Sequence, residues 1–143
     1  MCAAFKTPNR ILVIDDDLDL LMLLERRLIQ EHFEVETAVS LSEAEELIPS
    51  FLPHLVLLDI NVNGEDGRKL CYNIKQIYGD SIKVVIMTGY DYNHVMPVLF
   101  GADDLLSKPL HTEFLLHRIS LHLLPKTETD SPDTKLFKMN SRD

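Results

Sequence analysis

The chain has 143 residues, 45% of them hydrophobic and 26% charged, a balance typical of one soluble globular domain. Its formal net charge of −9 argues against direct nucleic-acid binding, because an acidic surface repels phosphates. No apolar run approaches the roughly 18 residues of a membrane span, nothing resembles a secretory signal, and Cys2 and Cys71 suggest no disulfide framework, so we expect a reducing, cytoplasmic setting.

The N-terminal part of the chain predicts two strands around one helix. Residues 1–9 are expected to be a disordered lead, and the apolar run at 10–14 predicts a buried strand that runs straight into Asp15–Asp17. Leucines at helical spacing predict a helix over 18–31, which one of these aspartates can cap. Residues 33–38 alternate apolar and polar side chains, which suits a strand near the edge of a sheet.

The next elements are a helix and the most apolar strand. Ser40 and Glu43 form a capping box at the start of the helix, and Pro49 is expected to end it. The unbroken apolar run at 55–58 predicts a strand buried on both faces, in the middle of a parallel sheet. Asp59 stands where that strand should end.

After Asp59 the chain is expected to continue as a polar loop through Gly67 and then to resume the alternation. Leu70, Ile74 and Ile77 form the predicted inward face of the next helix, and Gly79 is its stop signal. The remaining predicted elements are a helix over 68–78, a strand over 83–88, a short helix over 93–100 that contains Pro97, a strand over 104–107 and a helix over 112–124. Residues 125–143 read as a linker or C-terminal tail.

Alternating strands and helices predict one α/β domain over residues 10–124, with a doubly wound five-stranded parallel sheet and helices on both faces. The carboxyl ends of parallel strands lie at one edge of the sheet. In the strand order 2-1-3-4-5 of known folds of this flavodoxin-like class, strands one and three are neighbours.

This topology brings Asp15, Asp16 and Asp59 together at one edge. Crowded carboxylates repel one another in a partly desolvated cleft, and a hard divalent cation relieves the repulsion. All-oxygen ligation favours Mg²⁺, with Mn²⁺ as a substitute. Thr88 and Lys108, at the ends of the last two strands, could hold the oxygens of a phosphoryl group, and Asp59 could be the nucleophile that accepts it.

The combination of motifs resembles the receiver domain of two-component response regulators, the CheY-like family, over roughly residues 9–124. The matching residues are Asp15 and Asp16 in VIDDD, Asp59 in LLDIN, Thr88 in IMTG and Lys108 in LSKP. The resemblance implies that Asp16 and Asp59 bind Mg²⁺ directly, that Asp15 acts partly through water, and that Asn61 adds its backbone carbonyl.

The resemblance also implies a signalling role. Phosphate would arrive on Asp59 from a histidine kinase or a histidine phosphotransfer protein, with Thr88 and Lys108 reporting it to the surface. The expected catalysis is limited to self-phosphorylation and slow autodephosphorylation, so the chain is not expected to be an enzyme in the usual sense. The output, for example transcription regulation, is not encoded in these residues.

The chain departs from the family in three places. Leu105 stands three residues before the lysine, where the family usually has Tyr or Phe, which bears on the switch between this position and Thr88. Val62-Asn63 replaces the usual Met-Pro after the acceptor, and we expect a less constrained loop there. The stretch after Thr88 is shorter than usual, which with Pro97 predicts an irregular fourth helix.

Two other functions remain open. A flavodoxin-like cofactor binder is disfavoured because the sequence DDDLD puts carboxylates where a phosphate would have to sit. A phosphorylation-independent protein-interaction module on the same fold would be consistent with Leu105 and the shortened segment. In the last helix Phe114 and Leu121 form a stripe apart from the inward side chains. Scattered exposed apolar side chains are normal and this interpretation is favoured; the alternative hypothesis is a homodimer or output contact through the face at 93–124.

Overall fold

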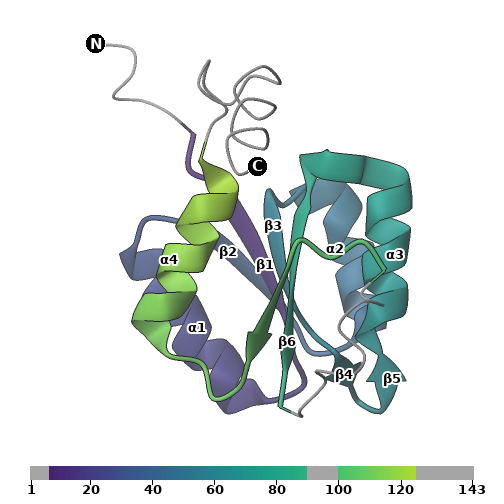
Figure 1. Cartoon of the computed structure of the whole chain (residues 1–143), viewed down its shortest axis with the longest axis horizontal. Helices are drawn as coiled ribbons and strands as arrows, with labels where there is room; N and C mark the ends of the chain where they lie inside the picture. Colours follow the sequence, from purple (N-terminus) through teal and green to yellow (C-terminus); the bar gives the residue numbers. More distant parts are fainter. Residues whose placement is uncertain (1–6, 90–99, 125–143) are drawn as a thin grey trace, which may run out of the picture.

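The computed structural model describes residues 7–89 and 100–124, and these residues form one sheet with helices on both sides (Figure 1). The strands are β1 (Arg10–Ile14), β2 (Glu34–Ala38), β3 (Leu55–Asp59), β4 (Asn61–Val62), β5 (Glu65–Asp66), β6 (Lys83–Thr88) and β7 (Asp104–Ser107). The helices are α1 (Leu18–Gln30), α2 (Leu41–Phe51), α3 (Gly67–Tyr78), the short 3₁₀ helix η2 (Gly79–Ser81) and α4 (Thr112–Leu123). None of these helices is long and apolar enough to cross a membrane.

The main sheet has five parallel strands in the order β2-β1-β3-β6-β7, which confirms the predicted doubly wound topology. Strands β1 and β3 are neighbours, with Ile14 opposite Leu58. The edge strand β2 exposes Glu34 and Glu36, as its alternating sequence predicts. Because all five strands run in one direction, their carboxyl ends lie along one edge of the sheet.

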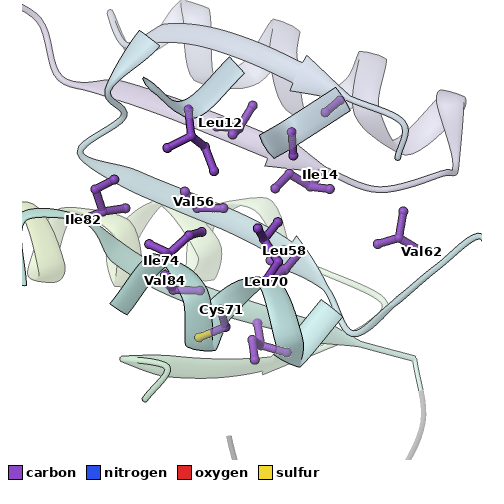
Figure 2. Packing of buried hydrophobic residues seen from close by; sticks show 14 of the residues in the cluster. Leu12, Ile14, Val56, Leu58, Val62, Leu70, Cys71, Ile74, Ile82 and Val84 are labelled. Carbon is purple, nitrogen blue, oxygen red and sulfur yellow. The ribbon is translucent and has the colours of Figure 1, made fainter. Parts of the chain in front are cut away.

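The two faces of the sheet form separate hydrophobic cores. Figure 1 shows α2 and α3 on one side of the sheet and α1 and α4 on the other. Alternate residues of each strand supply the two sides: Leu12 and Leu58 pack toward α2 and α3, and Val13 and Leu57 pack toward α1 and α4. Figure 2 shows the first core, in which Leu70, Cys71 and Ile74 of α3 meet the central strands. The central strands are therefore buried on both faces, which fixes the positions of their ends.

The helix termini follow their sequence signals. The Asp17 carboxylate accepts hydrogen bonds from the backbone amides of Asp19 and Leu20 and caps α1. Ser40 Oγ accepts from the Glu43 amide as predicted, whereas the Glu43 side chain accepts from the amide of Val39, one residue before the N-cap, rather than from Ser40. Gly79, with φ of 57°, ends α3 as predicted.

Three local predictions were wrong. Pro49 does not end helix α2, whose last residue is Phe51. The next residue, Leu52, caps the helix in a left-handed conformation. The proline removes one amide donor near the end of the helix, and the following turn still forms.

Ile77 is exposed rather than inward. The stretch after Asp59 forms the antiparallel β4–β5 hairpin instead of a plain loop. The predicted 93–100 helix except its last residue, the 125–143 tail and most of the 1–9 lead lie outside the described residues.

Helix α3 starts in direct contact with the end of β3. The Gly67 amide donates to the Ile60 carbonyl at 2.8 Å. A Cβ atom on Gly67 would lie 2.3 Å from the Asp59 carbonyl oxygen, far inside the distance at which such atoms can approach. Only glycine lets the first turn of α3 pack this closely against the backbone of Asp59.

We therefore expect Gly67→Ala to lower the free energy of unfolding by about 1–3 kcal/mol, the usual range for overpacking a well-packed site. Chemical denaturation with a circular dichroism readout measures the change. Gly89→Ala is the matched control, because nothing lies within 4 Å of a Cβ added there. Equal stability of the Gly67 and Gly89 variants would show that the close approach to Asp59 is not limiting.

Candidate functional site

The site lies where β1 and β3 end side by side. Asp59 is the last residue of β3, and Asp15 follows the last residue of β1. The Asp15 amide donates to the Ala38 carbonyl at 3.1 Å, so the sheet pairing with β2 extends through Asp15 and holds its backbone. Asp15 is fully buried, and Asp59 is 7% exposed. Two carboxylates thus sit inside the edge of the sheet.

Lys108 reaches this pair from the far strand. It follows β7, and its amide donates to the Thr88 carbonyl at 2.7 Å, which ties it to the end of β6. Its ammonium Nζ lies 2.7 Å from Asp15 Oδ2 and 3.2 Å from Asp59 Oδ2. One cation therefore bridges both buried carboxylates. The sequence predicts Lys108 at this edge of the sheet, but not its contact with Asp15 and Asp59.

Asp16 adds a third carboxylate at the entrance to the site. Its side chain is exposed, and Asp16 Oδ2 accepts a hydrogen bond from the Asn63 amide at 2.9 Å. Ligand oxygens of Asp15, Asp16 and Asp59 all lie within 4.8 Å of one another. Oxygens this close can share one hard divalent cation. The predicted acidic cluster is thus assembled, and its donor set fits such an ion.

The other predicted residues surround this cluster. Thr88 is 1% exposed and ends β6, the strand next to β3. The Asn61 amide donates to Asp59 Oδ1 at 3.3 Å, which orients the Asp59 side chain. Leu105 is half-buried in β7, opposite Ile86, and packs against the core on the α2 and α3 side. All these positions meet at the same end of the sheet or border it.

The charges in the site oppose one another. Burial raises the pKa of Asp59 above its ordinary value, the nearby charge of Asp15 raises it further, and Lys108 offsets only part of the shift. For Lys108, burial lowers the pKa, but the hydrogen bond to Asp15 and the charges of Asp59 and Asp15 outweigh it, so its pKa is raised. The lysine stays charged, while the cluster keeps an excess of negative charge that a metal ion would neutralise.

Two contributors to the site were not identified from the sequence. Gly67 allows α3 to approach the Asp59 backbone, and Asn63 binds Asp16. The Asn63-Gly64 pair carries a signal that could have been recognised, because Asn-Gly is the commonest sequence of a two-residue hairpin turn. Nothing in the sequence near Gly67 marks it as different from an ordinary loop glycine.

Comparison with known proteins gives one consistent family. The family model of the response regulator receiver domain matches residues 11–120. A BeF3-activated N-terminal receiver domain of RstA from Klebsiella pneumoniae is 32% identical, with a TM-score of 0.73, and the match covers 82% of this chain and 100% of that one. A two-component response regulator from Clostridium difficile is 30% identical, with a TM-score of 0.75 over 80% and 95% of the two chains.

A third similar structure extends over more of the chain. The CheY-like response regulator receiver domain protein of Methanospirillum hungatei JF-1 is 27% identical, with a TM-score of 0.74, and the match covers 96% of this chain and 100% of that one. All three similar structures are therefore matched over nearly their full lengths.

Because the pKa of Asp59 is raised in the folded state, ionisation of Asp59 should lower the free energy of unfolding of the metal-free protein as the pH rises. A group whose pKa is higher in the folded state stabilises the fold below its unfolded pKa, and this stabilisation is lost as pH rises through the folded pKa. In EDTA we expect Asp59→Asn to be more stable than the wild type at pH 7, with the difference shrinking toward pH 4. Urea denaturation across this pH range measures it.

Asp66 is a control for this measurement because its pKa is shifted in the opposite direction to that of Asp59. Its hydrogen bond to Arg68 lowers its pKa, so its contribution is present at neutral pH and lost as pH falls. Asp66→Asn should therefore be less stable than the wild type at pH 7, with the difference again shrinking on acidification. A wild type more stable than Asp59→Asn at pH 7 in EDTA would contradict the raised pKa.

Proposed function

The chain belongs to the response regulator receiver family, and from this premise we propose that it is a Mg²⁺-dependent phospho-accepting switch. Asp59 accepts a phosphoryl group from a histidine kinase or a histidine phosphotransfer protein. The observation that carries this proposal is the convergence on Asp59 of one ammonium and two further carboxylates from different strand ends. The proposed unit is the domain at residues 10–124.

The transfer follows from the placement of the side chains. A carboxylate oxygen of Asp59 attacks the phosphorus of a phosphohistidine, the new O–P bond forms as the P–N bond breaks, and the imidazole leaves with the electron pair. The Lys108 ammonium, 3.2 Å from Asp59 Oδ2, is close enough to bind a phosphoryl oxygen. The Thr88 hydroxyl, at the end of the neighbouring strand, is proposed to donate to another.

The proposed metal ligands are Asp16, Asp59 and the backbone carbonyl of Asn61, with Asp15 acting partly through water. When bound, the ion neutralises the charge on the carboxylates and on the incoming phosphoryl oxygens. Burial of Asp15 against Lys108 keeps the inner side of this site rigid. Mn²⁺ has the same preference for oxygen ligands and should substitute.

We propose that the signal leaves the site through β6 and β7. The Lys108 amide is bonded to the Thr88 carbonyl, so displacement of either residue is passed to the other. Leu105, half-buried in β7, stands where the family usually has Tyr or Phe. Its side chain has no polar group and cannot form a hydrogen bond with the Thr88 hydroxyl. The readout in this chain would therefore depend on the packing of Leu105.

The surface next to the site suits a helical phosphodonor. Helix α1 begins directly after the aspartates, and its outer side chains Leu18 and Met22 are 62% and 64% exposed. Apolar side chains at i and i+4 form one strip along a helix, which can pack against a helix of a partner. We propose this strip as the contact that brings a phosphohistidine to Asp59.

The phosphorylation-independent module is the alternative function. It requires that partner binding does not depend on Asp59, whereas the assembled acidic site is what phosphotransfer needs. Equal partner binding by the wild type and by Asp59→Ala, in the presence and absence of a phosphodonor, would favour the alternative. The flavodoxin-like alternative loses its basis, because a buried carboxylate rather than a phosphate-binding loop follows β1.

The direct test is phosphorylation of the full chain with acetyl phosphate and Mg²⁺. Intact-mass spectrometry should show one added phosphoryl group on the wild type and none on Asp59→Asn. Omission of Mg²⁺ or the change Asp16→Asn should slow the reaction by at least about tenfold, because the transferring charge loses its neutralising ion. Phe33→Leu is the control variant, because Phe33 directly precedes the amino end of β2, whereas Asp59 lies at the carboxyl end of β3.

BeF3 provides an independent check because it forms a stable acyl-phosphate mimic on a carboxylate. The similar RstA domain is described in a BeF3-activated form. NMR amide shifts around Asp59 should change on addition of beryllium fluoride with Mg²⁺. A folded wild type that gives neither an adduct nor shifts would reject phospho-acceptance.

We further propose that the outer stripe of α4 forms a homodimer or output contact. Phe114 and Leu121 are each 51% exposed, and the Arg118 guanidinium lies 5.3 Å from the centre of the Phe114 ring. Asp104 of β7 binds Arg118 and, at 2.8 Å, His122, so α4 is attached to the edge strand β7 beside this outer stripe.

The double change Phe114→Glu and Leu121→Glu should weaken self-association of the BeF3-treated protein by tenfold or more, since it places two charges in an apolar contact. Sedimentation velocity over a concentration series measures the dissociation constant. Leu23→Glu, an exposed leucine of α1, is the matched control. An unchanged sedimentation profile for the double variant would count against this face.

A further inference from the structure

The tip of the β4–β5 hairpin contacts two loops at the entrance of the site. The Asn63 amide N–H donates to Asp16 Oδ2 at 2.9 Å, in the loop between β1 and α1. The Asn63 side-chain Nδ2 donates to the Val39 carbonyl at 2.9 Å, in the loop between β2 and α2. Asn63 itself lies four residues after Asp59, so one residue links the acceptor strand to both neighbouring loops.

The local backbone fixes the direction of these bonds. Asn63 and Gly64 both have positive φ, 54° and 82°, the combination that a type I′ hairpin turn requires. Asparagine is among the few side-chain-bearing residues that tolerate this conformation. Val62, directly before the turn, is fully buried in the core on the α2 and α3 side and anchors the hairpin. The turn therefore has a defined conformation that directs both Asn63 hydrogen bonds.

Asp16 needs such support more than the other two carboxylates. Asp15 and Asp59 are buried and held by Lys108, whereas the Asp16 side chain is exposed. Among residues 7–89 and 100–124 the Asn63 amide supplies the hydrogen bond that we find on the Asp16 carboxylate. Without it, the carboxylate would be free to rotate into solvent, away from Asp15 and Asp59.

We propose that Asn63 is a positioning residue, which sets the metal affinity of the site by holding Asp16 in place. This inference rests on the proposed function, because it takes Asp16 as a ligand of Mg²⁺. A backbone N–H bound to one oxygen of a carboxylate leaves the other oxygen to face the ion and fixes its orientation. Hydrogen bonds of this outer kind typically change metal affinity by about 10–100-fold.

Two substitutions at position 63 distinguish the effect of the backbone N–H, which binds Asp16, from that of the side chain, which binds Val39. Asn63→Gly keeps the N–H and tolerates positive φ, and it removes only the bond to Val39. Asn63→Pro removes the N–H and cannot adopt positive φ. Calorimetric titration of the full chain with Mg²⁺ should give a dissociation constant near that of the wild type for Asn63→Gly. For Asn63→Pro we expect a loss of about 10–100-fold.

Hydrogen exchange gives a second measurement that does not require a folded proline variant. In metal-free wild type the Asn63 amide should be protected although it lies at an exposed hairpin tip. Asp16→Ala should remove this protection and leave the Glu43 amide, which donates to Ser40 Oγ, unchanged. The same change in both amides, or no protection at Asn63 in the wild type, would overturn the proposed hydrogen bond.

The outcomes also separate this inference from the proposed function. A wild type that binds Mg²⁺, with Asn63→Pro folded and binding equally tightly, would reject the positioning role and leave phospho-acceptance standing. A wild type that binds no Mg²⁺ would reject the metal site itself and the positioning role with it. A selective loss in Asn63→Pro together with Asn63 protection that depends on Asp16 supports the inference.

Discussion

The crowding of negative charge at the end of β1 and β3 is the constraint on which the rest of the site depends. Two of the carboxylates, those of Asp15 and Asp59, are buried, and the single ammonium of Lys108 is shared between them. The strands cannot move apart to relieve the repulsion, because each is hydrogen-bonded on both sides and packed on both faces. The fold thus holds the carboxylates at a separation that they would not adopt in solution, and a cation lowers the energy of this arrangement.

The sequence predicted the sheet well because each of its central strands is a continuous apolar run that ends at a charged or polar residue. The strand at 10–14 and the one at 83–88 have the predicted bounds, and the run at 55–58 needed only the addition of Asp59. The same logic predicted the cluster, since the carboxyl ends of parallel strands must lie along one edge. Topology supplied the three-dimensional information, and the residue types at the strand ends supplied the chemistry.

Local packing accounts for the predictions that failed. Ile77 fits the helical spacing of Leu70 and Ile74. The buried face of α3 also includes Cys71, however, so it is centred on the Cys71 side of the helix and Ile77 lies outside it. The hairpin after Asp59 depends on two positive φ angles and on a bond from Asn63 to a residue far away in the sequence. Such a long-range contact has no periodic signal. The absence of a proline in this segment predicts a less constrained loop, and what the structure shows there is a hairpin turn with two hydrogen bonds from Asn63.

The exposed glutamates of β2 have a consequence for how copies of the molecule can meet. Within the part of the chain that the structure describes, β2 pairs with a strand on one side only, and such borders are where sheets of different molecules can join. Glu34 and Glu36 would face their own counterparts if two copies paired there, at the cost of like-charge repulsion. Lateral growth into a continuous intermolecular sheet is therefore disfavoured at this border.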